Sequence, residues 1–264
     1  MPKEKKTVQP LSTWQTIGAS VTGVSHLKTD MPCQDAHALA ELSGGLLIIV
    51  VSDGAGSAAL ADVGAQTAVN AAMEYLRKYL PTFDPFNEPE EAQAFLTRVL
   101  QAARNAVEEE AANRLVMPRD LAATLIVLAA NARAAIAAQI GDGASVLQDG
   151  AGQLKAFTAP QQGEYVNETT FLISPDYLKA AQFRYERGNF THVALFSDGL
   201  QRLALKLPEA EPHAPFFTPL FGFVTQASEA TAEERNQQLA TFLQSPRIAE
   251  RADDDLTLVL AARR

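Results

Sequence analysis

Five aspartates stand at the ends of apolar segments, and their carboxylates are the side chains of this sequence best suited to chemistry. The most marked case is LLIIVVSDGAGS, in which an apolar run ends in Ser52 and Asp53 and glycines follow. A short run of Leu, Ile and Val closed by glycines is typical of a strand buried on both faces. The design recurs along the chain, and the candidate site residues are Asp35, Asp53, Asp142, Asp198 and Asp254.

A cation bound by these carboxylates would have hard oxygen ligands and almost no soft ligands. Oxygen-only sites suit magnesium or manganese rather than zinc. A single Asp-Gly pair is more simply explained as a turn, but several at strand ends favour a cluster. Such a cluster would repel itself unless it bound cations or had raised pKa values. Two divalent ions about 4 Å apart could share one bridging aspartate and activate a water molecule, as the hydrolysis of phosphate esters requires.

Other kinds of site have weaker support. The loop DGAGS is not a nucleotide-binding loop, because no G-x-x-x-x-G-K-S/T pattern follows it. His26 and His37 flank the polar loop before Asp35, where either could donate a proton to a leaving alcohol or make a structural hydrogen bond. His192 and His213 are interpreted as structural.

The segments that must position the aspartates form blocks of strands separated by helices. Strands are expected at 13–25, 36–42, 46–51, 121–130, 132–140, 144–154, 171–173, 192–196 and 256–262, with the block from 121 to 154 as a meander. Helices are expected at 58–80, 90–114 and 230–243, a polar connection at 184–189 and a loop at 208–219. Consecutive strands favour antiparallel sheets packed together with helices outside, an α+β arrangement.

The direction of the last strand carries a separate constraint. Asp53 and Asp198 follow their strands, whereas Asp254 precedes its own. The three can meet only if the last strand runs antiparallel to the other two.

The length, composition and net charge of the chain limit the classes of protein to which it can belong. With 264 residues, 47% of them hydrophobic, the chain can bury a large core, and one domain is expected after a flexible tail at 1–12. A net charge of -9 argues against nucleic-acid and anionic-membrane partners. The single cysteine, Cys33, excludes an internal disulfide and is expected to be buried or half-buried. No signal peptide or membrane span is evident, so a cytoplasmic location is expected.

Taken together, the motifs carry a resemblance. The segments SHLKTDMPCQDAH, VVSDGAGSA, AATL, IGDG, LFSDGL and DDDLTLVL occur in the order and at about the spacings found in the metal-dependent Ser/Thr protein phosphatases, the type 2C or PPM family. The match spans residues 18 to 262, so that 13–264 would form the phosphatase domain. The resemblance implies a four-layer α/β/β/α sandwich, with two central antiparallel sheets flanked by helix pairs.

The resemblance also assigns roles to the aspartates. Asp53 would bridge two metal ions, with the carbonyl of Gly54 as a further ligand. Asp198 and Asp254 would hold the second ion, and these three aspartates would be the catalytic residues. Asp35 would support the cluster through metal-bound water. Asp142, together with Asp198, would hold a third ion.

The sequence departs from the family pattern at two places. The family's usual glutamate before the first aspartate is Gln34 here, which removes one charge from the metal shell. The arginine that grips substrate phosphate in many members has no clear match, and Lys28 is nearest. Thr124 fits the small-Thr-Leu motif and is interpreted as structural. The segment GEYVNETTFL resembles a compact bacterial branch often encoded beside kinases, which would make a kinase or its target the natural partner.

The sequence therefore predicts a magnesium- or manganese-dependent phosphatase that hydrolyses phosphoserine or phosphothreonine in proteins through a metal-activated water. Two alternatives stay open at this point. One is a catalytically weak family member that binds a phosphoprotein or another partner. The other is a calcium-stabilised binding module that uses the acidic loops structurally.

Overall fold

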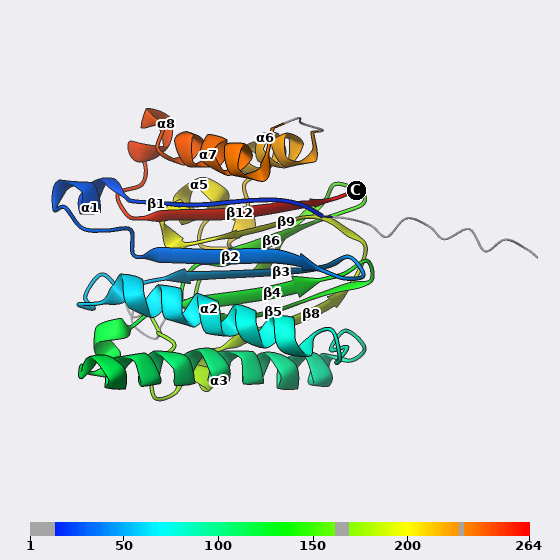
Figure 1. Ribbon diagram of the computed structural model, residues 1–264. Coiled ribbons are helices and arrows are strands. Elements are labelled where there is room, and N and C mark those ends of the chain that lie inside the picture. The colour runs from blue at the N-terminus through cyan, green and yellow to red at the C-terminus, as the bar shows by residue number, and fades with distance from the viewer. Residues whose placement is uncertain (1–13, 162–168, 227–229) are drawn as a thin grey trace, which may run out of the picture.

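Two five-stranded antiparallel sheets pack face to face in the middle of the molecule (Figure 1). The computed structural model describes residues 14–161, 169–226 and 230–264. The first sheet has the order β1 (Trp14–Val21), β12 (Leu256–Arg263), β9 (Phe190–Phe196), β6 (Ala144–Asp149) and β7 (Leu154–Thr158). The second has the order β2 (Asp35–Leu42), β3 (Leu46–Asp53), β4 (Leu125–Ala130), β5 (Ala134–Ile140) and β8 (Gln182–Arg187).

Helices cover the outer face of each sheet. The long helices α2 (Ala61–Tyr79) and α3 (Pro89–Arg114) lie against the second sheet, and α6 (Ala214–Thr225) and α7 (Ala232–Leu243) lie against the first (Figure 1). The shorter elements are α1 (Val24–Lys28), η1 (Pro118–Leu121), α4 (Tyr177–Ala180), η2 (Asp198–Leu200), α5 (Gln201–Ala204), β10 (Leu205–Lys206), β11 (Glu211–Pro212) and α8 (Pro246–Ala249). The predicted α+β sandwich of two antiparallel sheets with helix pairs outside is confirmed.

Strand β3 explains why its sequence is apolar without a break. Successive side chains of a strand point to opposite faces of the sheet. Leu47, Ile49 and Val51 accordingly pack between the two sheets. Ile48 and Val50 pack toward the helical layer of α2 and α3. Both faces of the strand are buried, and its first polar residues, Ser52 and Asp53, are the last two residues of the strand.

Several predicted elements were wrong. The block from 121 to 154 is not one meander, because β4 and β5 belong to the second sheet while β6 and β7 belong to the first. Residues 171–173 form a turn instead of a strand. Leu172 is apolar there because its side chain is buried, and its N–H donates to the carbonyl of Ala123 at 2.8 Å.

Two further segments differ from the expectation. The polar connection expected at 184–189 is mostly β8, which pairs with β5 at the edge of the second sheet. The loop expected at 208–219 contains β11 and the first half of α6. The first strand ends at Val21, and α1 begins three residues later.

Some predictions lie outside the described residues. These are the flexible tail at 1–12 and most of the segment GEYVNETTFL, of which residues 163–168 are not described. Within the described ranges, no helix is both long and apolar enough to cross a membrane.

Candidate metal centre

The first two aspartates meet because their strands are hydrogen-bonded neighbours. Asp35 opens β2 and Asp53 closes β3, and the antiparallel register places the two residues opposite each other. Ser197, which ends the connection from β9, donates its hydroxyl to Oδ2 of Asp35 at 2.7 Å. Asp35 is therefore buried at the junction of the two sheets. Sequence reasoning predicted the proximity of these aspartates, and the register supplies its cause.

Thr124 fixes the backbone that carries Asp53. Its hydroxyl accepts the N–H of Asp53 at 3.0 Å, and its own N–H donates to the Asp53 carbonyl at 2.8 Å. The following residue, Gly54, packs so closely on α2 that a Cβ would lie 2.6 Å from the carbonyl oxygen of Ala61. The structural role expected for Thr124 fits these contacts, and a glycine is required at position 54.

Asp142 and Asp198 complete a cluster with Asp53. Asp142 lies in the turn between β5 and β6, and Asp198 begins η2 directly after β9. One carboxylate oxygen from each of the three residues lies within 4.8 Å of the other two. Thr169 donates its hydroxyl to Oδ2 of Asp142 at 2.8 Å, so that this side chain already has one fixed partner.

Asp254 lies beside this cluster but groups more closely with two other residues. β12 runs antiparallel to β9, as the convergence of these residues required. The charge of Asp254 contributes to raising the pKa of Asp198, which places the two near each other. Asp254 instead forms a group with His26 and Asp255, in which one potential ligand atom of each residue lies within 4.8 Å of the other two. The structure thus brings Asp53, Asp142 and Asp198 together and places Asp254 at their border.

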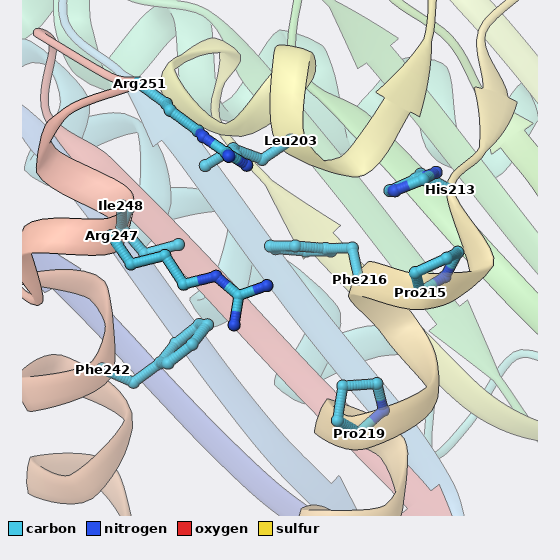
Figure 2. A pocket seen from close by; sticks show the side chains of 9 residues that line it. All are labelled: Leu203, His213, Pro215, Phe216, Pro219, Phe242, Arg247, Ile248 and Arg251. Carbon is cyan, nitrogen blue, oxygen red and sulfur yellow. The ribbon is translucent and has the colours of Figure 1, made fainter.

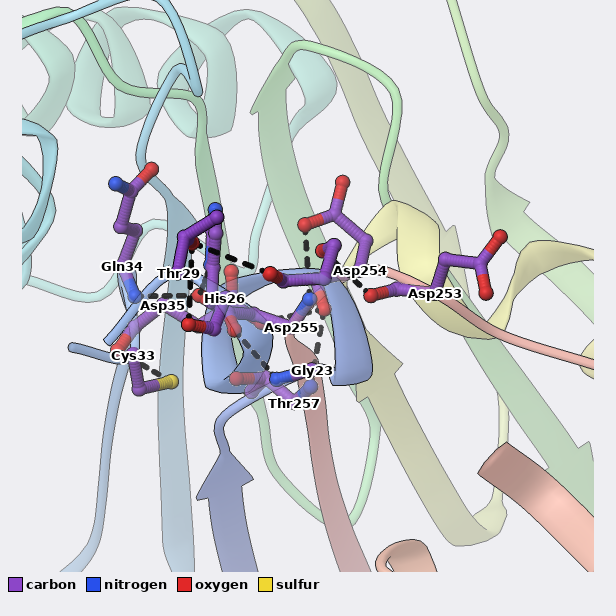
Figure 3. Close-up of polar contacts among 12 residues, drawn as sticks. Gly23, His26, Thr29, Cys33, Gln34, Asp35, Asp253, Asp254, Asp255 and Thr257 are labelled. Atoms are coloured by element: carbon purple, nitrogen blue, oxygen red, sulfur yellow. Dashed lines mark hydrogen bonds and ion pairs between the residues drawn. The ribbon is translucent and has the colours of Figure 1, made fainter. Parts of the chain in front are cut away.

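Asp255 is the residue that sequence reasoning missed. Its buried carboxylate accepts the N–H of Gly23 at 2.7 Å and the N–H of Gln34 at 2.5 Å, and Nδ1 of His26 lies 3.0 Å from its Oδ2 (Figure 3). It therefore ties the ends of β1 and β12 to the loop that leads into β2. In Figure 3 the side chains of Asp253 and Asp254 extend away from it. The run of three aspartates before β12 indicates that this segment belongs to the site. It does not indicate which of the three side chains points inward.

Burial and mutual repulsion perturb the acids of the cluster. Burial, followed by the charges of Asp35 and Asp198, raises the pKa of Asp53 well above its usual range. Burial also raises the pKa of Asp35 to about 7 and that of Asp198 to about 6, with neighbouring aspartates adding to both. Carboxylates in such a setting favour a proton or a cation.

Three buried side-chain oxygens near the cluster are available to a divalent cation. Oδ1 of Asp35, Oδ1 of Asp198 and Oε1 of Gln34 are buried without a hydrogen-bond partner. Buried oxygens of this kind are costly unless a donor or cation satisfies them. Every oxygen in the set is hard, as magnesium and manganese prefer. The residues present therefore fit such an ion.

The remaining candidates have structural surroundings. Nδ1 of His37 lies 2.8 Å from the hydroxyl of Ser20, and burial lowers the pKa of its ring. His192 bonds Thr225 and stacks on Phe221, in line with the structural role expected for it. Cys33 is half-buried as predicted, and burial raises the pKa of its thiol. Lys28 lies on the short helix α1 and is exposed.

Comparisons with known proteins identify relatives of this chain. The family described as Protein phosphatase 2C matches residues 22–244. Serine/threonine-protein phosphatase 3 of Escherichia coli (strain K12) is 36% identical over 94% of this chain and 98% of its own length.

Solved structures share the fold. That of the serine/threonine phosphatase Stp1 from Staphylococcus aureus has a TM-score of 0.64 at 14% identity, covering 98% of both chains. That of RsbX in complex with magnesium has a TM-score of 0.52 at 15% identity, covering 97% of this chain and 98% of its own. The family match and the extent of the Escherichia coli relative show that this chain belongs to the protein phosphatase 2C family.

Proposed function

We propose that this protein is a magnesium- or manganese-dependent phosphatase that removes phosphate from phosphoserine and phosphothreonine residues of proteins. The observation that carries the proposal is the cluster of Asp53, Asp142 and Asp198, whose ligand oxygens lie within 4.8 Å of one another with raised acid pKa values for two of its members. The name of the Escherichia coli relative supports the substrate class.

The proposal gives each aspartate a role. Asp53, on which the charges of Asp35, Asp198 and Asp142 all act, would contact two ions, with the carbonyl of Gly54 as a further ligand. Asp198 and Asp254 would hold the second ion, and Asp142 a third together with Asp198. Divalent ions bound there would neutralise the phosphate ester and lower the pKa of a water molecule enough to make it a nucleophile. The magnesium bound by RsbX supports the choice of ion.

The chain's own residues hold this arrangement before any ligand arrives. Asp35 is fixed by the hydroxyl of Ser197, and its charge raises the pKa of Asp53. Asp255 holds the loop that carries Gln34 against the start of β12. Preorganised carboxylates of this kind need no rearrangement during the reaction, which is where electrostatic catalysis gains most.

Three finer points belong to the same proposal. Residues 13–264 would form the phosphatase domain, extending the family match at both ends. A kinase or its target is the expected phosphoprotein partner, and the acidic chain is expected to act without nucleic acid or membrane. A cytoplasmic location stays a prediction from the sequence.

The test compares phosphorylated peptides under different metals. Purified protein should release phosphate from phosphoserine and phosphothreonine peptides with manganese or magnesium but not with calcium. Asp53→Asn should lower the rate by about a hundredfold or more, since several kcal/mol of charge stabilisation is lost. Asp253→Asn, an exposed aspartate two residues before the Asp255 anchor, is the matched control and should keep full activity. Binding of the peptides without turnover would instead support the weak, partner-binding alternative.

A further inference from the structure

A cavity of about 140 Å³ lies among the helices that cover the first sheet, away from the aspartate cluster. We call it the arginine pocket, and the residues that define it are His213, Phe216, Leu203, Phe242, Arg247 and Arg251. In Figure 2 the guanidinium of Arg247 reaches between Phe242 and Phe216. Arg251 approaches beside Leu203, and His213 lies on the opposite side. None of the proposed metal-binding aspartates lines it.

Two guanidinium groups line the pocket, and both belong to exposed residues, Arg247 and Arg251. Within the described residues, neither Arg247 nor Arg251 forms an ion pair or a side-chain hydrogen bond. Four arginines elsewhere in the described chain pair with carboxylates, at 2.6 to 3.4 Å, whereas the exposed Arg77 and Arg98 form no ion pair with another described residue. Acidic side chains are in excess in this chain, which carries a net charge of -9. Two cations that line one cavity match a dianion, and a guanidinium group binds phosphate in a bidentate manner.

Apart from His213, the rest of the pocket wall is apolar. Phe216 and Ile248 are buried, and Phe242 closes the side toward α7. A second cavity, of about 260 Å³, adjoins the first through Pro219 and Phe242 and is lined almost entirely by apolar side chains. Apolar cavities of about 150 Å³ accept a group the size of benzene. A ligand that contacted both the arginines and the apolar side chains would carry a negatively charged group on a small apolar body.

We propose that the arginine pocket is a second, non-catalytic binding site for a phosphate monoester with an apolar body. Arg247 and Arg251 would hold the phosphate, and Phe216 and Phe242 would contact the body. Two sources share this chemistry: a free small ester, and a phosphorylated side chain of a protein. The site does not depend on the metal centre, so this proposal and the proposed activity can fail separately.

The probe is phenylphosphonate, whose carbon–phosphorus bond keeps the enzyme from consuming it. The full-length protein with magnesium is labelled with ¹⁵N at arginine, and the Nε signals of Arg247 and Arg251 are followed during titration. Both signals should move and saturate together. Benzoate and inorganic phosphate, which lack the second charge or the apolar body, should bind more weakly. Unmoved signals at saturating phenylphosphonate would overturn the proposal.

Variants separate the pocket from general charge effects. Arg247→Gln with Arg251→Gln should weaken binding at the pocket by about tenfold or more, as expected when charge-assisted bonds to phosphate are lost. Arg77→Gln with Arg98→Gln makes the same charge change on exposed positions of α2 and α3 and should leave binding unchanged. Both double variants should keep wild-type turnover of p-nitrophenyl phosphate. Equal affinity in the two double variants would refute the site.

A further arm identifies the source of the ligand. A peptide that carries a phosphonomethyl-phenylalanine side chain is titrated in the same way. Tighter binding than phenylphosphonate, lost in Arg247→Gln with Arg251→Gln, supports a phosphorylated protein as the ligand. Weaker binding of the peptide than of phenylphosphonate supports a free small ester.

Discussion

Metal removal should make the stability of this protein fall as pH rises, and Asp35 provides the clearest measure. Burial, reinforced by the charges of Asp255 and Asp198, raises its pKa from 3.8 to about 7 in the folded protein. A group whose folded pKa is raised binds more protons folded than unfolded, so deprotonation disfavours the folded state. Well below the pKa of the unfolded state, Asp35 is protonated in both states and does not affect the free energy of unfolding. Above the pKa of the folded state, the loss of stability caused by Asp35 is complete.

The magnitude follows from these two values. Between about pH 5 and about pH 7 the unfolded carboxyl is ionised while the folded carboxyl keeps its proton, so the free energy of unfolding falls by about 1.4 kcal/mol per pH unit. Asp35 alone should therefore cost about 3 kcal/mol across this interval. Bound magnesium favours the carboxylates, and the loss should disappear when the ion is present.

Urea unfolding at several pH values, with chelator or with magnesium, measures this linkage. Asp35→Asn should flatten the pH dependence of the metal-free protein by about one proton, because the amide does not ionise. Asp253→Asn, at an exposed position, should leave the dependence as in the wild type. A metal-free wild type whose stability stays constant or rises between about pH 5 and about pH 7 would refute the reasoning.

Three further changes test individual residues. Gln34→Glu should lower the manganese concentration needed for half-maximal activity, because it adds a charge where a buried amide oxygen lacks a partner; unchanged metal affinity in calorimetry would place residue 34 outside the site. Asp142→Asn should keep two bound ions while kcat falls, and full kcat would leave Asp142 as a turn residue. Asp255→Ala should cost about 2 to 5 kcal/mol in urea unfolding, since two buried N–H groups lose their acceptor; a cost below about 1 kcal/mol would contradict the anchoring role.

The convergence of the aspartates could be predicted because it follows from strand ends. Asp35 and Asp53 flank apolar runs that pair in an antiparallel register, and Asp198 lies just beyond the end of β9 in the packed sheet. The inward direction of Asp255 could not be predicted, since it depends on the pleat at the start of β12. Sequence reasoning chose Asp254, which lies at the border of the cluster instead.

The missed elements have identifiable causes. Pro215 and Pro219 suggested a loop, but Pro215 falls in the first turn of α6, where a helix tolerates proline. Burial of Phe217 and Phe221 against the first sheet outweighs the hydrogen bond lost at Pro219. In β8 the signal was present, because Phe183 and Tyr185 alternate with polar residues as in a half-buried strand.

The role of the aspartate cluster can be tested most directly by anomalous diffraction from crystals soaked in manganese. The account predicts manganese peaks in contact with Asp53, with a neighbouring ion held by Asp198 and Asp254, and loss of these peaks in Asp53→Asn. A crystal without manganese at Asp53, or with manganese only among His26, Asp254 and Asp255, would contradict it.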